Sequence, residues 1–168
     1  MFETKRLQVR PLSLEELKRH IEFPVCFAQE LGFTPSSSLI DKETQEAISN
    51  DLLPKLSDPS KDPLFYTMWI LIEKSKKAII GGICFHGEPD ESGEVEIGYG
   101  IDEGYQNQGY MTETIAGIIG FTKNMAHVKA IKAETECSNV SSIKVLEKNG
   151  FQIVSNNGEM VILKLWLD

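Results

Sequence analysis

The sequence predicts a mixed α/β fold in which helices flank a mostly antiparallel central sheet of about seven strands. The chain has 168 residues, of which 41% are hydrophobic and 25% charged, and this suits one globular domain spanning residues 1–168. Strand-like runs separated by short turns predict antiparallel hairpins. One strand–helix–strand unit in the second half predicts a parallel pair, because parallel neighbours need a long crossover. The expected order of elements is β-α-α-β-β-β-α-β-α-β-β.

The first third of the chain predicts one strand and two helices. Alternating apolar residues predict a strand at 4–10. Ser13 and Glu16 have the spacing of a capping box, which is typical of a helix N-terminus. The residues of segment 23–41 are rich in Pro, Gly and Ser and predict a loop, whereas apolar periodicity predicts a second helix at 42–56.

The remaining two thirds predict six strands and two helices. β-Branched, aromatic and alternating runs predict strands at 65–73, 78–86, 94–101, 128–137, 151–155 and 160–166. Apolar residues at helical spacing predict a helix over 111–125, and a second helix over 139–149 ends at Gly150. Nothing repeats at a fixed period, which excludes a solenoid.

The balance of charged residues limits the classes of function that the protein can have. Seventeen basic and 25 acidic residues give a net charge of -8, which argues against a nucleic-acid-binding protein and suits a cationic partner such as an amine. No apolar run has the length of a signal peptide or a membrane span, so we expect a cytoplasmic protein without membrane contact. The three cysteines lack paired spacing and the three histidines are scattered, which predicts reduced thiols and no metal site.

A glycine-containing loop between a strand and a helix carries the clearest chemical signal. The segment from Tyr105 to Glu113 reads YQNQGYMTE and leads into the helix expected at 111–125. The first amides of a helix lack internal partners, and the helix dipole adds partial positive charge there. Gly109 leaves room for a phosphate to approach these amides. The loop therefore favours an anion cradle that fits a pyrophosphate, although an ordinary strand-to-helix turn also contains glycine.

Three motifs, in the right order, resemble the GNAT superfamily of N-acetyltransferases. Gln106, Gly109 and Met111 match its acyl-CoA motif Gln/Arg-x-x-Gly-x-Gly/Ala, with Met111 in place of the usual small residue. The strand sequence EIGY at 96–99 and the helix sequence at 139–151 are similar to the branch that includes the ribosomal-protein N-terminal acetyltransferases. The resemblance covers 65–166 well.

The resemblance implies that acetyl-CoA is the co-substrate and that the sheet splits between the strands at 94–101 and 128–137. The pantetheine arm would bind in this gap to backbone amides, and the pyrophosphate would bind the loop amides. Asn107 replaces a glycine of the branch loop, which leaves its backbone amide in place. The implied cofactor-binding residues are Tyr99, Gly100, Ile101, Gln106, Asn107, Gln108, Gly109, Tyr110, Met111, Thr112 and Asn139. Asn139 also has the residue type of a plain helix N-cap.

Direct acetyl transfer requires a group that removes a proton from the amine, because a Lys-like amine has a pKa of about 10.4. Glu94 and Glu96 share one face of their strand, and we expect Glu96 to be the base. Glu94, His86 and water are the alternatives. In this branch of the superfamily a Ser lies near the sulfur, which implies Ser142, whereas Leu146 occupies the position of the Tyr that many relatives use.

We therefore expect an N-acetyltransferase that moves an acetyl group from acetyl-CoA to a primary amine. The acceptor is a protein N-terminus or a small-molecule amine, with a slight preference for a peptide, and nucleic acid is not expected to bind. The alternative is a catalytically weak acyl-CoA-binding module that acts as a sensor or partner subunit. Either form would be a monomer or a homodimer.

Overall fold

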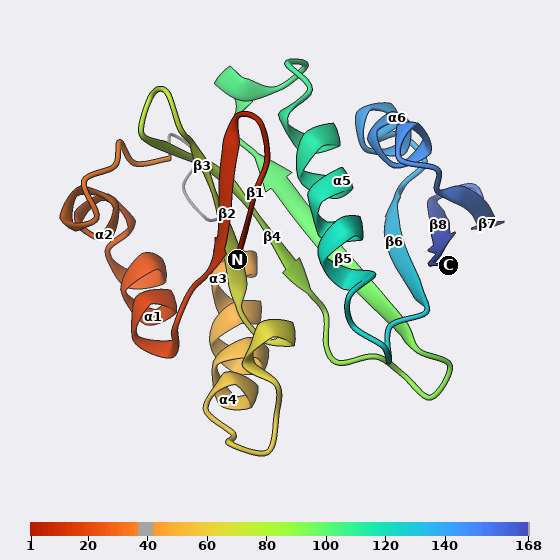
Figure 1. Cartoon of the computed structure of the whole chain (residues 1–168), viewed down its shortest axis with the longest axis horizontal. Coiled ribbons are helices and arrows are strands. Elements are labelled where there is room, and N and C mark those ends of the chain that lie inside the picture. Colours follow the sequence, from red (N-terminus) through yellow and green to blue (C-terminus); the bar gives the residue numbers. More distant parts are fainter. Residues whose placement is uncertain (37–41, 168) are drawn as a thin grey trace.

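The computed structural model describes residues 1–36 and 42–167, which form one eight-stranded sheet in the order β1-β2-β3-β4-β5-β6-β8-β7 (Figure 1). The strands are β1 Phe2–Glu3, β2 Leu7–Pro11, β3 Met68–Glu73, β4 Ala78–Phe85, β5 Glu94–Ile101, β6 Ala130–Glu136, β7 Gln152–Asn156 and β8 Met160–Trp166. All neighbouring pairs are antiparallel except β5 and β6, which confirms the predicted mixed sheet. The strand expected at 4–10 corresponds to β2, which begins only at Leu7, and β1 is an additional short strand that pairs with it.

The helices confirm most of the predicted pattern. They are α1 Leu14–Glu22, α2 Pro24–Glu30, α3 Lys42–Ala47, a π-helical turn at Ile48–Leu52, α4 Leu53–Leu56, α5 Tyr110–Thr122 and α6 Val140–Lys148, with short 3-10 turns at Pro63–Phe65 and Glu103–Tyr105. The capping box of Ser13 and Glu16 is present at the start of α1. The π turn precedes Pro54, which has no N–H to continue regular α-helical bonding.

The prediction of a loop at 23–41 is wrong for the first part of this segment, where α2 forms. Pro24 occupies the first turn of α2, where its fixed φ suits a helix and its missing N–H costs nothing. Phe27 and Ala28 of α2 are buried in the core that this helix forms with the sheet. This packing stabilises a short helix in a segment whose composition predicts a loop. Residues 37–41 of that expected loop lie outside the described residues.

Two apolar cores cover the two faces of the sheet. One core joins residues of α1, α2 and the π turn to Ile70, Ile72 and Ile79 of the sheet. The other joins α5 and α6 to the opposite face, where Trp69, Phe85 and Ile131 are almost completely buried. Figure 1 shows α5 crossing the sheet in front of β5, with α6 beside β6. Within the described ranges, no helix is both long and apolar enough to cross a membrane.

The parallel pair of β5 and β6 separates after only three paired positions. These run from Glu94 opposite Ala130 to Glu96 opposite Lys132. The Glu96 carbonyl and the Asp102 amide both bond to the β4 side. Backbone groups alternate along a strand, so those of Ile97, Tyr99 and Ile101 face the gap on the β6 side. The sheet thus splits where the resemblance places the pantetheine arm.

Candidate functional site

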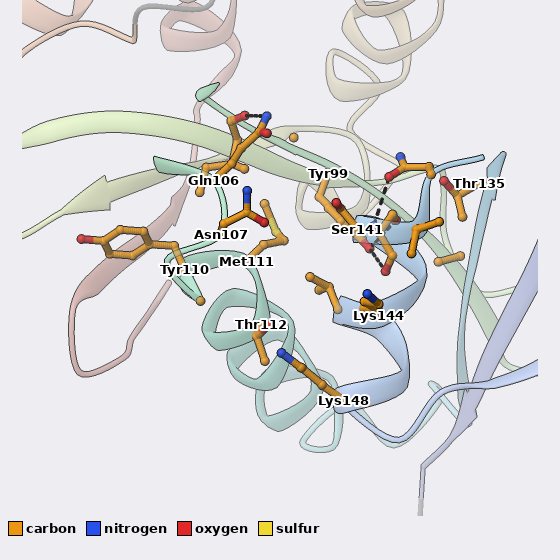
Figure 2. Close-up of a pocket in the computed structure, with 18 of the residues that line it drawn as sticks. Tyr99, Gln106, Asn107, Tyr110, Met111, Thr112, Thr135, Ser141, Lys144 and Lys148 are labelled. Carbon is orange, nitrogen blue, oxygen red and sulfur yellow. Dashed lines mark hydrogen bonds between the residues drawn. The ribbon is translucent and has the colours of Figure 1, made fainter. Parts of the chain in front are cut away.

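A cavity of about 700 Å³ lies in the gap between β5 and β6, under α5 and α6 (Figure 2). Of the implied binding and catalytic residues, it is lined by Tyr99, Gly100, Ile101, Gln106, Asn107, Gly109, Tyr110, Met111, Thr112, Asn139 and Ser142. Gln108 is not among the lining residues. Its side-chain amide donates to the Gly104 carbonyl at 2.8 Å instead, so it stabilises the loop from outside the cavity. Glu96 also lies outside this lining.

Two left-handed residues shape the loop ahead of α5. Gly109 is the N-cap of α5 with φ +80°, a conformation that side chains disfavour. Asn107 has φ +57°, and Asn is among the few side chains that adopt this region with little strain. The substitution of the branch glycine by Asn107 therefore preserves a glycine-like turn. The first turn of α5 lines the cavity with Tyr110, Met111 and Thr112, and the backbone amides of such a turn have no partners within the helix.

Arg6 and Glu113 hold this loop against the N-terminal hairpin. Glu113 accepts hydrogen bonds from the Arg6 backbone N–H at 2.8 Å, from Arg6 Nε at 2.7 Å and from the Thr4 hydroxyl. Arg6 also donates to the Gln108 carbonyl at 2.9 Å, and its guanidinium lies 4.1 Å from the centre of the Tyr110 ring. Burial tends to raise the pKa of Glu113, but the bonds from Thr4 and Arg6 outweigh it and lower that pKa.

A polar chain joins β5 to the start of α6. Asn139 caps α6 by accepting the Ser142 N–H at 3.1 Å, and the Ser142 hydroxyl lies 2.8 Å from the Tyr99 hydroxyl. Burial raises the pKa of Tyr99 above its ordinary value, so its phenol stays protonated near neutral pH. Sequence reasoning assigned only the backbone of Tyr99 and missed this hydroxyl. Leu146 is fully buried in the core and takes no part.

Two lysines of α6 were also missed by the sequence reasoning. Lys144 and Lys148 line the cavity, and Figure 2 shows the Lys148 side chain extending from α6 toward Thr112 of α5. Their spacing of four residues places them on one face of a helix, and this spacing in the sequence could have predicted that they lie together. They bring positive charge to a cavity in a chain of net charge -8. The cavity therefore combines helix amides and lysines, both of which attract phosphates.

The expected base lies on the opposite face of the sheet, in a row of charged groups. Glu96 Oε1 is 3.0 Å from His86 Nδ1, and Glu96 Oε2 is 2.7 Å from Lys132 Nζ. Burial tends to raise the pKa of Glu96, but the bonds from Lys132 and His86 outweigh it and lower that pKa. Glu94 is paired with Lys164. Both carboxylates are thus already engaged by cations or by hydrogen-bond donors.

His86 lines a second cavity that shares the end of β5 with the first. The shared residues are Gly98, Tyr99, Gly100 and Ile101. A Cβ at position 98 would lie 2.6 Å from His86 Nε2, so the imidazole lies directly over Gly98. The two cavities therefore meet at β5 from opposite faces, with Tyr99 and Ser142 on one side and His86 on the other.

Comparisons with known proteins agree with this geometry. The family model described as an acetyltransferase (GNAT) domain matches residues 6–152. An uncharacterised N-acetyltransferase of Bacillus subtilis, YjdG, is 29% identical over 161 residues, which cover 95% of this chain and 94% of the relative.

Solved structures share the fold at low sequence identity. A ribosomal-protein-S5-alanine acetyltransferase from Vibrio fischeri is 19% identical with a TM-score of 0.67, over 99% of this chain and 96% of the other. A chimera of the spermidine N-acetyltransferase from Vibrio cholerae is 14% identical with a TM-score of 0.65, over 96% of each chain.

Proposed function

Because the chain belongs to the acetyltransferase (GNAT) domain family and is an N-acetyltransferase, we propose that it transfers an acetyl group directly from acetyl-CoA to a primary amine. The observation that carries this proposal is the cavity at the split between β5 and β6. Its backbone edge suits the pantetheine amides, and the amides of Asn107–Thr112 suit the pyrophosphate. Lys144 and Lys148 suit the remaining phosphate charge.

In the proposed reaction the amine attacks the thioester carbonyl where the two cavities meet. A new N–C bond forms, the C–S bond breaks, and its electron pair leaves on the sulfur. The amine must lose a proton, and His86 is the side chain best placed to accept it through Nε2. The contact of His86 Nδ1 with the Glu96 carboxylate fixes Nδ1 as the donor and leaves the Nε2 lone pair over Gly98. Glu96 then acts through His86, as a positioning residue that stabilises the imidazolium.

The leaving thiolate receives its proton from the other face. Tyr99 and Ser142 share a hydrogen bond in the cofactor cavity, and the buried phenol keeps a proton that it can supply. In this proposal the Tyr99–Ser142 pair takes the role of the tyrosine that many relatives have at the position of Leu146. The proton accepted by His86 returns to solvent, and Tyr99 regains a proton from solvent. The reaction therefore ends with an N-acetylated amine, free CoA thiol and both side chains in their starting states.

The proposal is tested with acetyl-CoA binding and thiol release in matched charge variants. Gly109→Glu places bulk and negative charge at the N-terminus of α5 and should abolish acetyl-CoA binding in calorimetry. Gly120→Glu adds the same charge at the other end of α5, where a Cβ meets nothing within 4 Å, and should bind normally. Equal affinity in both variants would refute the assigned cofactor site. Tight acetyl-CoA binding without thiol release on any amine would instead indicate a binding module.

A further inference from the structure

The second cavity has a volume of about 880 Å³ and lies on the face of the sheet that α1, α2 and the π turn cover. This volume lies in the range of small-molecule sites, which run from about 300 to 1,000 Å³. Because it meets the cofactor cavity at Gly98–Ile101, a molecule bound here would present its amine to the thioester. The chemistry of its walls should therefore select the acceptor.

The cavity exists because its floor carries almost no side chains. Gly82 and Cys84 of β4 pair with Gly100 and Gly98 of β5, so small residues share this face. A Cβ at position 82 would come within 2.2 Å of Met68 Cε, which places the Met68 side chain across the strand at this point. A Cβ at position 100 would meet nothing within 4 Å. The floor is thus largely flat backbone, with the flexible Met68 side chain above Gly82 and the Cys84 and His86 side chains beside Gly98.

The walls of the cavity are mainly apolar. Helical residues on one side and a sheet residue on the other supply Pro24, Ala28, Ile48, Leu52 and Ile79. Among the described lining residues, no Lys or Arg occurs and the carboxylates are those of Asp51 and Asp102. Asp51 pairs with Lys55 at 2.7 Å, and Asp102 accepts a hydrogen bond from the Ser36 hydroxyl. Burial lowers the pKa of His20, so this wall residue stays neutral near pH 7.

We propose, on the basis of the function proposed above, that the acceptor is a small primary amine with an apolar body and no second charge, such as an arylalkylamine. Burial of one large apolar group contributes about 1.5–3 kcal/mol, which corresponds to about tenfold to 100-fold in affinity. The single amine would lie at the junction of the two cavities, within reach of His86. The apolar body would lie over the glycine floor, against Met68 and Ile48.

The same walls disfavour the two other acceptor classes. A polyamine would place a second ammonium in a mainly apolar space whose two carboxylates already bind Lys55 and the Ser36 hydroxyl, and a charge that is not fully compensated there costs free energy. A peptide would bring backbone amides that need hydrogen-bond partners, but the floor strands already bond to each other across Gly82 and Gly100. The cavity therefore argues against the slight preference for a peptide that the sequence suggested.

The test compares 2-phenylethylamine, spermidine and an N-terminal peptide at equal concentration, with CoA thiol release as the first readout. We expect kcat/KM for 2-phenylethylamine to exceed that of the other two by about tenfold or more. Met68→Gln keeps the side-chain length but makes it polar, and should lower this preference about three- to tenfold. Met160→Gln is the matched control, because Met160 lies on β8 and lines neither cavity.

A second readout separates the failure of this inference from that of the proposed function. Binding of 2-phenylethylamine to the CoA-loaded protein is measured by saturation-transfer NMR in wild type and in Met68→Gln. Preferred acetylation of spermidine or of any peptide would overturn the inference and leave the acetyltransferase reaction in place. Binding that weakens in Met68→Gln without thiol release would support the cavity chemistry and refute the proposed function. Absence of both binding and acetylation would overturn the inference.

Discussion

Glu113→Gln should loosen the loop that we propose binds the pyrophosphate, because it removes the charge that holds the loop to the N-terminal hairpin. Glu113 accepts three hydrogen bonds, two of them from Arg6, and its side chain is 19% exposed. A hydrogen bond to a charged group contributes about 1.5–3 kcal/mol, and Gln retains some of the contacts through its single oxygen. We expect the free energy of unfolding to fall by about 2 kcal/mol, which for a chain of this size lowers Tm by about 4–8 °C.

The pH dependence of the difference in Tm between wild type and Glu113→Gln tests whether the Glu113 charge causes it. The pKa of Glu113 is lower in the folded protein than its ordinary value near 4.3, so its stabilising effect is fully present above that pH. The effect is lost as the pH falls through the lowered pKa, because the carboxylate becomes protonated. The gap in Tm between wild type and Glu113→Gln should therefore narrow on acidification below about pH 4.

Glu15→Gln is the matched control for thermal unfolding. Glu15 is 78% exposed and pairs with Lys18 one turn along α1, so its loss should cost less than about 0.5 kcal/mol. Differential scanning fluorimetry with and without acetyl-CoA measures both variants. Equal shifts in the two variants, or a Glu113→Gln shift that is independent of pH, would refute the argument.

Three further predictions concern the reaction centre. Glu96→Gln and His86→Ala should each lower kcat by roughly 10²-fold with little change in acetyl-CoA affinity, measured by stopped assays and calorimetry; wild-type rates in both from pH 6 to 9 would leave water as the base. Tyr99→Phe should lower kcat more than Ser142→Ala, because water can replace the serine hydroxyl but not the buried phenol; the reverse order would remove Tyr99 from proton delivery. Asn107→Gly should leave acetyl-CoA affinity and Tm nearly unchanged, since the position already adopts φ +57°; a large loss of affinity would show that the Asn side chain itself binds.

Local patterns in the sequence determined much of the fold. The strict alternation at Glu94–Ile101 predicted β5 with its observed bounds, and the capping box predicted the start of α1. Such signals depend on backbone geometry within a few residues, so they can be interpreted without tertiary information. The loop around Gly109 was likewise predicted to connect a strand to a helix, and α5 begins at Tyr110 directly after it. The left-handed backbone of Asn107 and Gly109 was not predicted.

The tertiary structure alone decided which side chains meet. Tyr99 and Ser142 are 43 residues apart and come together because β5 and α6 flank the same gap. The contact between His86 and Glu96 depends on the register of β4 with β5, and a slip of one residue would turn one partner to the opposite face. The second cavity depends on glycines of two strands that face a helical layer far away in the sequence. These features follow from strand register and packing, which no local pattern specifies.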